Sequence, residues 1–467
     1  MRKTSFINFS PSRFGPLSFY REALAIALPV MLQQFIMSMV SLIDNFMVAG
    51  LGDISMAAVN VANQIGFIYI VILNTVCQAG GIYIAQFRGA GDSDGMKHAF
   101  RFKIIFSLAA AAVYFALCWT LPHRLIAAMT MGNSQQAEII EVGTTYIKIM
   151  SFVLVPMAVT FSIGTSFREI AKPKVPLFIS AAATLVNTAG NWILIYGNLG
   201  APRLEVSGAA YATIIARVFE LAVFLLYAAR VKAPFFVGIR RLFDIHLKFF
   251  KEILVKSGMI FASELSWVSS ETIMTAMYNR RGGAEVVAGM AAGWTIANIF
   301  FMLFSGIWTA SGVLVGGALG GGKLDEARQR AGWLKSGSIV AGVIIALPGI
   351  AFSWAVVPLV FSNLSQAARA NCMGLISVIL AYLPVWGYLN VLFSVSRAGG
   401  DAATGMYTDL SVNTLLFVPG AVILSFFTSM PPVPMFALLK ISDFAKVFIA
   451  RHFLNKERWV RNLTKNT

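Results

Sequence analysis

Charged residues are scarce in this sequence. Only 12% of its 467 residues are Asp, Glu, Lys or Arg, whereas 57% are hydrophobic, and the mean hydropathy is +0.73. Soluble globular domains carry roughly 25% charged residues, so the composition excludes a soluble protein. The hydrophobic residues form runs that reach the roughly 20 residues needed to cross a bilayer as a helix. The sequence therefore predicts an all-α polytopic membrane protein.

Signatures of catalysis and metal binding are also missing. The four histidines lie far apart, and neither HExxH nor GxSxG occurs. The segment Gly317–Leu324, "GALGGGKL", resembles a phosphate loop, but leucine stands where Ser or Thr should bind magnesium, so we interpret it as a tight cytoplasmic turn. We predict that the protein is not an enzyme and has no cofactor. The cysteines show no disulfide or metal spacing and are interpreted as small core residues: Cys77, Cys118 and Cys372.

Hydrophobic runs separated by polar turns predict twelve membrane-spanning helices. Their expected ranges are 22–50, 54–80, 97–121, 137–165, 175–197, 206–230, 252–280, 285–312, 332–358, 370–396, 403–428 and 433–453. We expect an N-lobe of six helices over residues 22–230 and a C-lobe of six over residues 252–453. The other expected parts are an N-terminal segment (1–21), an interlobe linker (231–251) and a basic C-terminal tail (454–467).

The net charge of +16 follows this predicted topology. Lys and Arg cluster in the connections after even-numbered spans and at the C-terminus. The connections after odd-numbered spans contain fewer Lys and Arg residues, with Arg280 and Arg281 as the exception. The positive-inside rule therefore places both termini in the cytoplasm and predicts a multi-pass protein of the cytoplasmic membrane. No basic aromatic module is present, so we expect no nucleic-acid partner.

The two halves of the chain resemble each other when one is shifted by 231 residues. In that register Gly52 meets Gly283, Gly91 meets Gly322, and the alignment needs no gap. Two halves of six spans, both starting in the cytoplasm, predict parallel repeats related by a pseudo-two-fold axis along the membrane normal. Secondary transporters with this design bind substrate between the lobes and alternate access by rocking them.

A carboxylate, Asp44, lies within the first predicted span. An ionised carboxylate at membrane depth costs at least about 2.5 kcal/mol unless it faces protein or water. Gln33, Met37 and Ser41 share its helical face, and Pro29 predicts a bend in this helix. We interpret Asp44 as an ion-coupling residue, with Gln33 on the same polar stripe. A permanently paired structural acid is the alternative.

The second predicted span carries four amides on one helical face, namely Asn60, Gln64, Asn74 and Gln78. We expect this face to line the N-lobe, with Asn60 and Gln64 among the residues that contact ion or substrate. The alternative is interhelical hydrogen bonding alone, worth roughly 0.6 kcal/mol per pair.

Acidic side chains also occur in the spans of the second half. Glu264 and Glu271 lie seven residues apart on one face of the seventh span, and two acids lining one cavity favour cation binding. A sodium ion is therefore considered at Glu264 and Glu271 as well as at Asp44. The alternative is that Glu271 pairs with Arg280 or Arg281.

Further charges lie in the last two spans, and they are secondary candidates for ion coupling: Asp409, Asp443 and Lys446. A spacing of three allows Asp443 to pair with either Lys440 or Lys446 on one helix face. We interpret the charges of the last span as a structural, self-neutralised group.

Several motifs together resemble the multidrug and toxic compound extrusion (MATE) family over nearly the whole chain. They are "LPVMLQQ" with "LIDNFMVAGLGDISMAAVNVANQI" in the first two spans, "YIKI" at 146–149, "NTAGNWILIYGNLGAPRLEVSGAAYAT" at 187–213, "RAGGD" at 397–401 and "KERWVRN" near the end. The resemblance implies two V-forming six-helix lobes. It also implies export of amphipathic, often cationic compounds, driven by proton or sodium entry.

The resemblance also implies roles for single residues in the first half. Asp44 matches the first-span acid whose protonation or sodium binding couples transport, and Tyr146 and Asn187 match its polar neighbours. Some branches carry a second acid four residues after that asparagine, where this chain has Asn191. Coupling in the first lobe is therefore expected to rest on Asp44.

In the second half the chain departs from another branch. The family Glu of the seventh span falls near Val268 and the Asp of the tenth span near Trp386, and neither acid is present there. Glu264 and Glu271 lie one turn to either side of Val268 and are candidates to substitute. The coupling ion, H+ or Na+, is left open by these residues.

The predicted function is a secondary active multidrug efflux antiporter that acts as a monomer in contact with membrane lipids. Two alternatives remain. One is a lipid or lipid-linked oligosaccharide flippase of the same superfamily, which an arginine-rich cavity would favour; here we expect amides, acids and aromatics such as Trp267 and Trp294. The other is a non-transporting membrane sensor.

Overall fold

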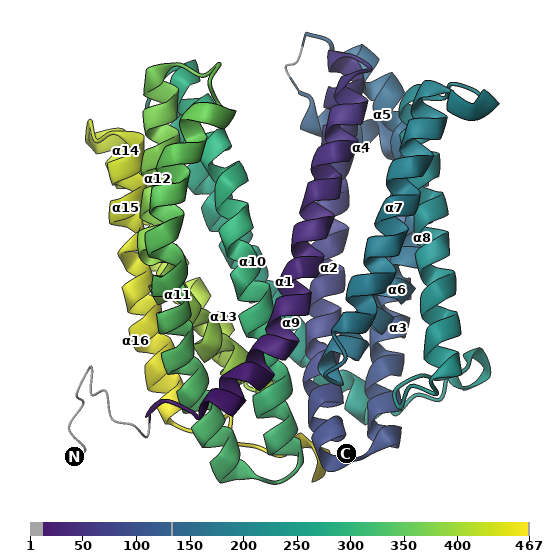
Figure 1. Cartoon of the computed structure of the whole chain (residues 1–467), viewed down its shortest axis with the longest axis vertical. Helices are drawn as coiled ribbons and strands as arrows, with labels where there is room; N and C mark the ends of the chain where they lie inside the picture. The colour runs from purple at the N-terminus through teal and green to yellow at the C-terminus, as the bar shows by residue number, and fades with distance from the viewer. Residues whose placement is uncertain (1–12, 132–133, 466–467) are drawn as a thin grey trace. The chain divides into compact units, whose positions relative to one another are not determined.

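The structure is a computed structural model that describes residues 13–131 and 134–465, and its regular secondary structure is helical throughout (Figure 1). Residues 1–12 of the predicted N-terminal segment and the last two residues of the tail lie outside the described part. In the first half the helices are α1 (Leu17–Ala49), α2 (Asp53–Ala90), α3 (Ser93–Thr120), α4 (Pro122–Met129), α5 (Gln136–Met150), α6 (Leu154–Glu169), α7 (Lys174–Tyr196) and α8 (Glu205–Arg230). In the second half they are α9 (Leu247–Asn279), α10 (Ala284–Gly320), α11 (Leu324–Val360), α12 (Gln366–Ala398), α13 (Ala403–Val412), α14 (Val418–Phe427), α15 (Pro432–Lys440) and α16 (Ser442–Asn455).

Every expected span corresponds to a helix or to consecutive helices. The fourth is α5 and α6 joined by a short 3-10 turn, the eleventh is α13 and α14 joined by the π-helical segment Asn413–Phe417, and the twelfth is α15 with α16. Within residues 13–131 and 134–465, ten helical segments are long and apolar enough to cross a membrane, and α9 and α15 with α16, at the seventh and twelfth predicted spans, are not among them. The short helix α4 was not expected, and α2, α10 and α11 run further than predicted. The all-α class is confirmed.

The chain folds into two compact units. Unit 1 contains Gly258–Thr467 together with the chain up to Leu28 and the short stretch Gly89–Gly91. Unit 2 contains Pro29–Arg88 and Asp92–Ser257. Helix α1 therefore changes unit at Pro29, although it continues as one helix through that residue.

The two halves share local structure at the register that the sequence repeat predicts. The turn after α2 has Gly91 at φ +73°, and the turn after α10 has Gly322 at φ +74°. Both turns close with the same backbone hydrogen bond of 2.9 Å, from Asp92 N to Phe87 O and from Lys323 N to Ala318 O. These are helix ends that require a left-handed residue, which explains glycine at both positions.

Close helix packing in unit 2 positions the polar residues described below. Helices α7 and α8 pack with almost no side chain between them at Gly208, where a Cβ atom would lie 2.4 Å from the Leu194 carbonyl oxygen. At Gly190 a Cβ would lie 3.0 Å from the Ala212 Cβ. Small residues let helices approach closely when hydrophobic association between them is weak, as in a membrane. The polar side chains of α7 and α8 therefore face each other across a narrow interface.

Candidate functional site

The acid on α1 lies against two amides of α7. Asn191 Nδ2 donates a hydrogen bond to Asp44 Oδ1 at 2.6 Å. With its amide group turned so that all partners are satisfied, Asn187 Nδ2 lies 3.1 Å from both Asp44 carboxylate oxygens, and its oxygen accepts from Thr213 Oγ1 at 3.3 Å. Both asparagines are buried, with 6% and 1% of Asn187 and Asn191 exposed. The structure thus brings together Asp44, Asn187 and Asn191.

Helix geometry accounts for this arrangement. Asn187 and Asn191 are four residues apart and therefore share one face of α7. Tyr146 on α5 is buried, interacts electrostatically with Asp44, and packs in the same hydrophobic core cluster as Val48 of α1. The residues that the sequence resemblance placed around Asp44 are therefore close to it.

Two charged residues of α8 complete this group, and sequence reasoning missed them. Arg217 Nη1 donates to Glu220 Oε2 at 2.6 Å, and the Glu220 side chain is only 4% exposed. Arg217 also interacts electrostatically with Asp44. Its guanidinium therefore forms an ion pair with Glu220 and acts on Asp44 through a longer-range electrostatic interaction. Asp44 and Glu220 together carry one negative charge more than Arg217 neutralises.

A hydrogen-bonded chain continues from Glu220 through neighbouring helices. Ser180 Oγ donates to Glu220 Oε1 at 2.8 Å, and Gln33 Nε2 donates to Ser180 Oγ at 2.9 Å. Arg168 Nη2 in turn donates to Gln33 Oε1 at 2.8 Å. Gln33 therefore belongs to this chain, and about three turns of α1 separate it from Asp44.

The predicted polar face of α2 is less involved. Asn60 is half-buried and Gln64 is exposed. Within residues 13–131 and 134–465, neither side chain has a hydrogen-bond partner. The alternative role, hydrogen bonding between helices, therefore does not apply to Asn60 and Gln64. Their contact with ion or substrate remains a prediction.

In unit 1 each predicted glutamate has its own basic partner. Arg397 Nη1 lies 3.3 Å from Glu264 Oε1, and Lys440 pairs with Glu271. The alternative pairing of Glu271 with Arg280 or Arg281 is wrong. Arg281 donates to two backbone carbonyl oxygens near the end of α14, and the Arg280 guanidinium lies over the Phe426 ring at 3.8 Å from its centroid.

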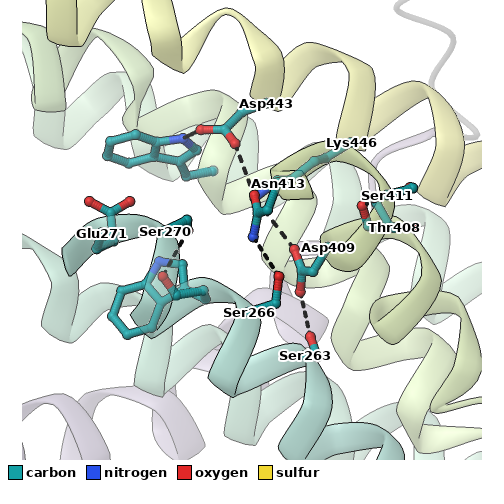
Figure 2. A network of polar contacts seen from close by, with 12 residues as sticks. Ser263, Ser266, Ser270, Glu271, Thr408, Asp409, Ser411, Asn413, Asp443 and Lys446 are labelled. Atoms are coloured by element: carbon teal, nitrogen blue, oxygen red, sulfur yellow. Dashed lines mark hydrogen bonds and ion pairs between the residues drawn. The ribbon is translucent and has the colours of Figure 1, made fainter. Parts of the chain in front are cut away.

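The secondary candidates of the last two spans come together around one ammonium group. Lys446 Nζ lies 3.5 Å from Asp409 Oδ1 and 3.4 Å from Asp443 Oδ1, and Figure 2 shows it between the two carboxylates. Asp443 therefore pairs with Lys446, while Lys440 binds Glu271. Trp386 Nε1 donates to the second Asp443 oxygen at 2.8 Å, and Ser263 donates to Asp409.

Known proteins resemble this chain over most of its length. The family model MatE matches two segments of equal length, residues 29–193 and 259–423, one in each half. A probable multidrug resistance protein NorM of Halalkalibacterium halodurans is 26% identical over 331 residues, which cover 69% of this chain and 70% of the relative. The probable multidrug resistance protein YoeA of Bacillus subtilis is 24% identical over 422 residues, 88% of either chain.

Solved transporter structures share the fold. A MATE in the bent conformation superposes with a TM-score of 0.84 at 16% identity, covering 98% of this chain and 99% of the other. A mutant of the Vibrio cholerae MATE transporter VcmN gives a TM-score of 0.84 at 17% identity, covering 97% of this chain and 100% of the other. The predicted architecture of two six-helix lobes is therefore confirmed as the fold class.

Proposed function

This chain belongs to the MatE family of multidrug efflux transporters, and from that premise we propose that it exports amphipathic, often cationic compounds in exchange for a monovalent cation. The export is driven by the ion gradient alone, without a cofactor. The protein lies in the cytoplasmic membrane with both termini in the cytoplasm, as the distribution of Lys and Arg predicts.

The observation that carries this proposal is the environment of Asp44. Its carboxylate lies in an apolar helix, receives hydrogen bonds from Asn191 and Asn187, and interacts electrostatically with Arg217, which pairs with Glu220. Arg217 forms its ion pair with Glu220, and among the described residues no basic side chain lies within ion-pair distance of Asp44. A buried charge is costly unless it is compensated, so binding a monovalent cation stabilises the group. Asp44 is therefore expected to bind and release a cation more readily than a carboxylate that is held in an ion pair.

We propose that this ion is a proton. Both amides approach Asp44 through their N–H groups, which suits an ionised carboxylate, whereas a sodium ion would need their oxygens. The other orientation of the Asn187 amide suits a protonated Asp44. Asn187 Nδ2 then donates to Thr213 Oγ1 at 3.3 Å, and its oxygen faces the acid and accepts the carboxylic proton. The amide thus has a hydrogen-bonding arrangement for each protonation state.

The proposed cycle couples this proton to access. Protonation from outside neutralises the group, α1 repacks near Pro29, and the lobe releases its substrate before the lobes rock to the inward-facing state. One charge moving through 100 mV supplies roughly 2.3 kcal/mol, enough for about a fifty-fold concentration ratio.

The test is efflux of a fluorescent cationic dye from vesicles that contain the purified protein, with a proton gradient or a sodium gradient imposed separately. We expect flux with the proton gradient and its loss in Asp44→Asn. Asp53→Asn, at an exposed acid that begins α2, is the matched control and should transport normally. Flux driven by sodium alone would contradict the proton assignment. Dye flux at the wild-type rate in Asp44→Asn would contradict the role of Asp44, and no flux under either gradient would favour a flippase or a sensor.

A further inference from the structure

A second group with unbalanced charge lies in unit 1, formed by Asp409 of α13 and by Asp443 and Lys446 of α16. The ammonium nitrogen of Lys446 lies 3.5 Å and 3.4 Å from the two carboxylates (Figure 2). All three residues are buried, with 7%, 5% and 6% of Asp409, Asp443 and Lys446 exposed. We call these three residues the Lys446 triad.

The neighbouring charges leave the excess negative charge of the Lys446 triad unchanged, because each neighbouring base is paired with an acid, although Arg397 also acts electrostatically on Asp409 and Glu271 on Lys446. Arg397 of α12 lies 3.3 Å from Glu264 of α9, and Lys440 of α15 pairs with Glu271 of α9. Tyr382 of α12 donates its hydroxyl to the Ala437 carbonyl oxygen at 2.9 Å. Two carboxylates therefore share one ammonium group at a depth where an uncompensated charge is strongly unfavourable.

A buried acceptor without a donor lies beside the triad. Asn413 is 3% exposed and follows Asp409 by four residues, so both share one helix face. Its Nδ2 donates to Ser266 Oγ at 3.0 Å, whereas its Oδ1 has no partner, and Figure 2 shows this oxygen on the side of Lys446 and Asp443. Asn413 also begins the π-helical segment, a distortion that is frequent at functional sites.

We propose that the Lys446 triad binds one proton, which is held by the two carboxyl groups of Asp409 and Asp443. The proton makes the charges of the triad equal, since one carboxylate then faces one ammonium group. It also adds an O–H donor to the group beside the Asn413 oxygen, which has no hydrogen-bond partner. The site is a second proton site in a different unit from Asp44. The claim that this second proton is coupled to transport rests on the proposed antiport. The claim that the triad binds a proton does not depend on it.

The test is infrared spectroscopy of the purified full-length protein that carries Asp44→Asn, so that the first site is silent. Exposed Asp and Glu are ionised above about pH 6, so a carboxylic C=O band at neutral pH reports buried protonated acids. We expect this band to weaken on alkalinisation and to lose one acid's intensity when Asp409→Asn is added. Asp443→Asn removes the same excess charge and should cause the same loss, which provides a second variant if the first does not fold.

Changes at the ammonium group separate this proposal from a purely structural ion-pair role. Lys446→Gln leaves two buried carboxylates without a counter-charge, and each should then bind a proton. The carboxylic C=O band of the triad should therefore grow roughly twofold. Adding Asp409→Asn to Lys446→Gln should reduce the intensity of this band to that of one protonated acid. A band that is unchanged by Asp409→Asn and Asp443→Asn would overturn the proposal, and so would a band seen only after sodium is removed. Neither result depends on transport, so the proposed antiport is tested separately.

Discussion

Removing the charge of Glu220 tests whether the Arg217–Glu220 pair supports the Asp44 site. In Glu220→Gln, Arg217 loses the carboxylate that its Nη1 contacts at 2.6 Å, and Ser180 keeps only an amide partner. Breaking a buried ion pair by removing one partner costs about 3–5 kcal/mol. We expect about 3 kcal/mol, the lower end, because Arg217 is 27% exposed and still has Asp44 as a partner. Unfolding in mixed detergent micelles measures this loss.

The same variant should change how transport depends on pH. With Glu220 neutral, Arg217 is left to Asp44 alone and favours its ionised form, so more acid is needed to protonate it. A gain of about 1.4 kcal/mol in that interaction lowers the pH of half-maximal efflux by one unit. Arg217→Gln added to Glu220→Gln should cost less stability than the sum of the two single variants, because neither member of the 2.6 Å pair is then left without its partner. Strictly additive costs and an unchanged pH profile would refute the argument that the Arg217–Glu220 pair acts on Asp44.

Three further predictions concern contacts in unit 2. Asn191→Ala removes a 2.6 Å hydrogen bond to a carboxylate, worth about 1.5–3 kcal/mol, and should shift the pH profile of dye efflux up by about one to two units, because the ionised form of Asp44 loses a donor. An unshifted profile would argue against the contact. Lys103→Met should destabilise the protein by about 3–5 kcal/mol, since it leaves Glu169, 2.9 Å away, without its ammonium group. Adding Glu169→Gln should recover most of this loss in the same unfolding assay. Gly208→Ala should cost at least about 1–3 kcal/mol, because its Cβ would lie 2.4 Å from a carbonyl oxygen of α7, whereas Gly66→Ala, with open space around it, should be tolerated.

The sequence was sufficient to predict helices and the first acid, but not the height of a residue along its helix relative to the other helices. Gln33 and Asp44 share a face of α1, and that face led to both being placed in one site. They are eleven residues apart, which is about 16 Å along a helix. Gln33 consequently meets Ser180 and Arg168, at another level. Periodicity gives the direction of a side chain, while the site also depends on its position along the axis.

Partners from distant segments could not be predicted from local spacing. Glu271 finds Lys440, 169 residues away, whereas the sequence offered Arg280 and Arg281 within a few turns. The pair Arg217 and Glu220 is different, because its signal was present. Two opposite charges spaced by three residues stand in a stretch, 206–229, that has no other charge. At membrane depth such a pair indicates a buried contact.

The internal repeat makes a prediction that neither half makes alone. Gly91 and Gly322 occupy equivalent turns, with φ of +73° and +74° and the same closing hydrogen bond of 2.9 Å. No atom lies within 4 Å of the Cβ position at either glycine, so an alanine there is opposed by the backbone conformation alone. The left-handed region costs a non-glycine residue roughly 1–2 kcal/mol. Gly91→Ala and Gly322→Ala should therefore lower the free energy of unfolding by equal amounts, while Gly312→Ala, within α10 and in open space, should not lower it. Unequal costs would mean that the two turns differ in their surroundings and that the repeat preserves the backbone without preserving its energetics.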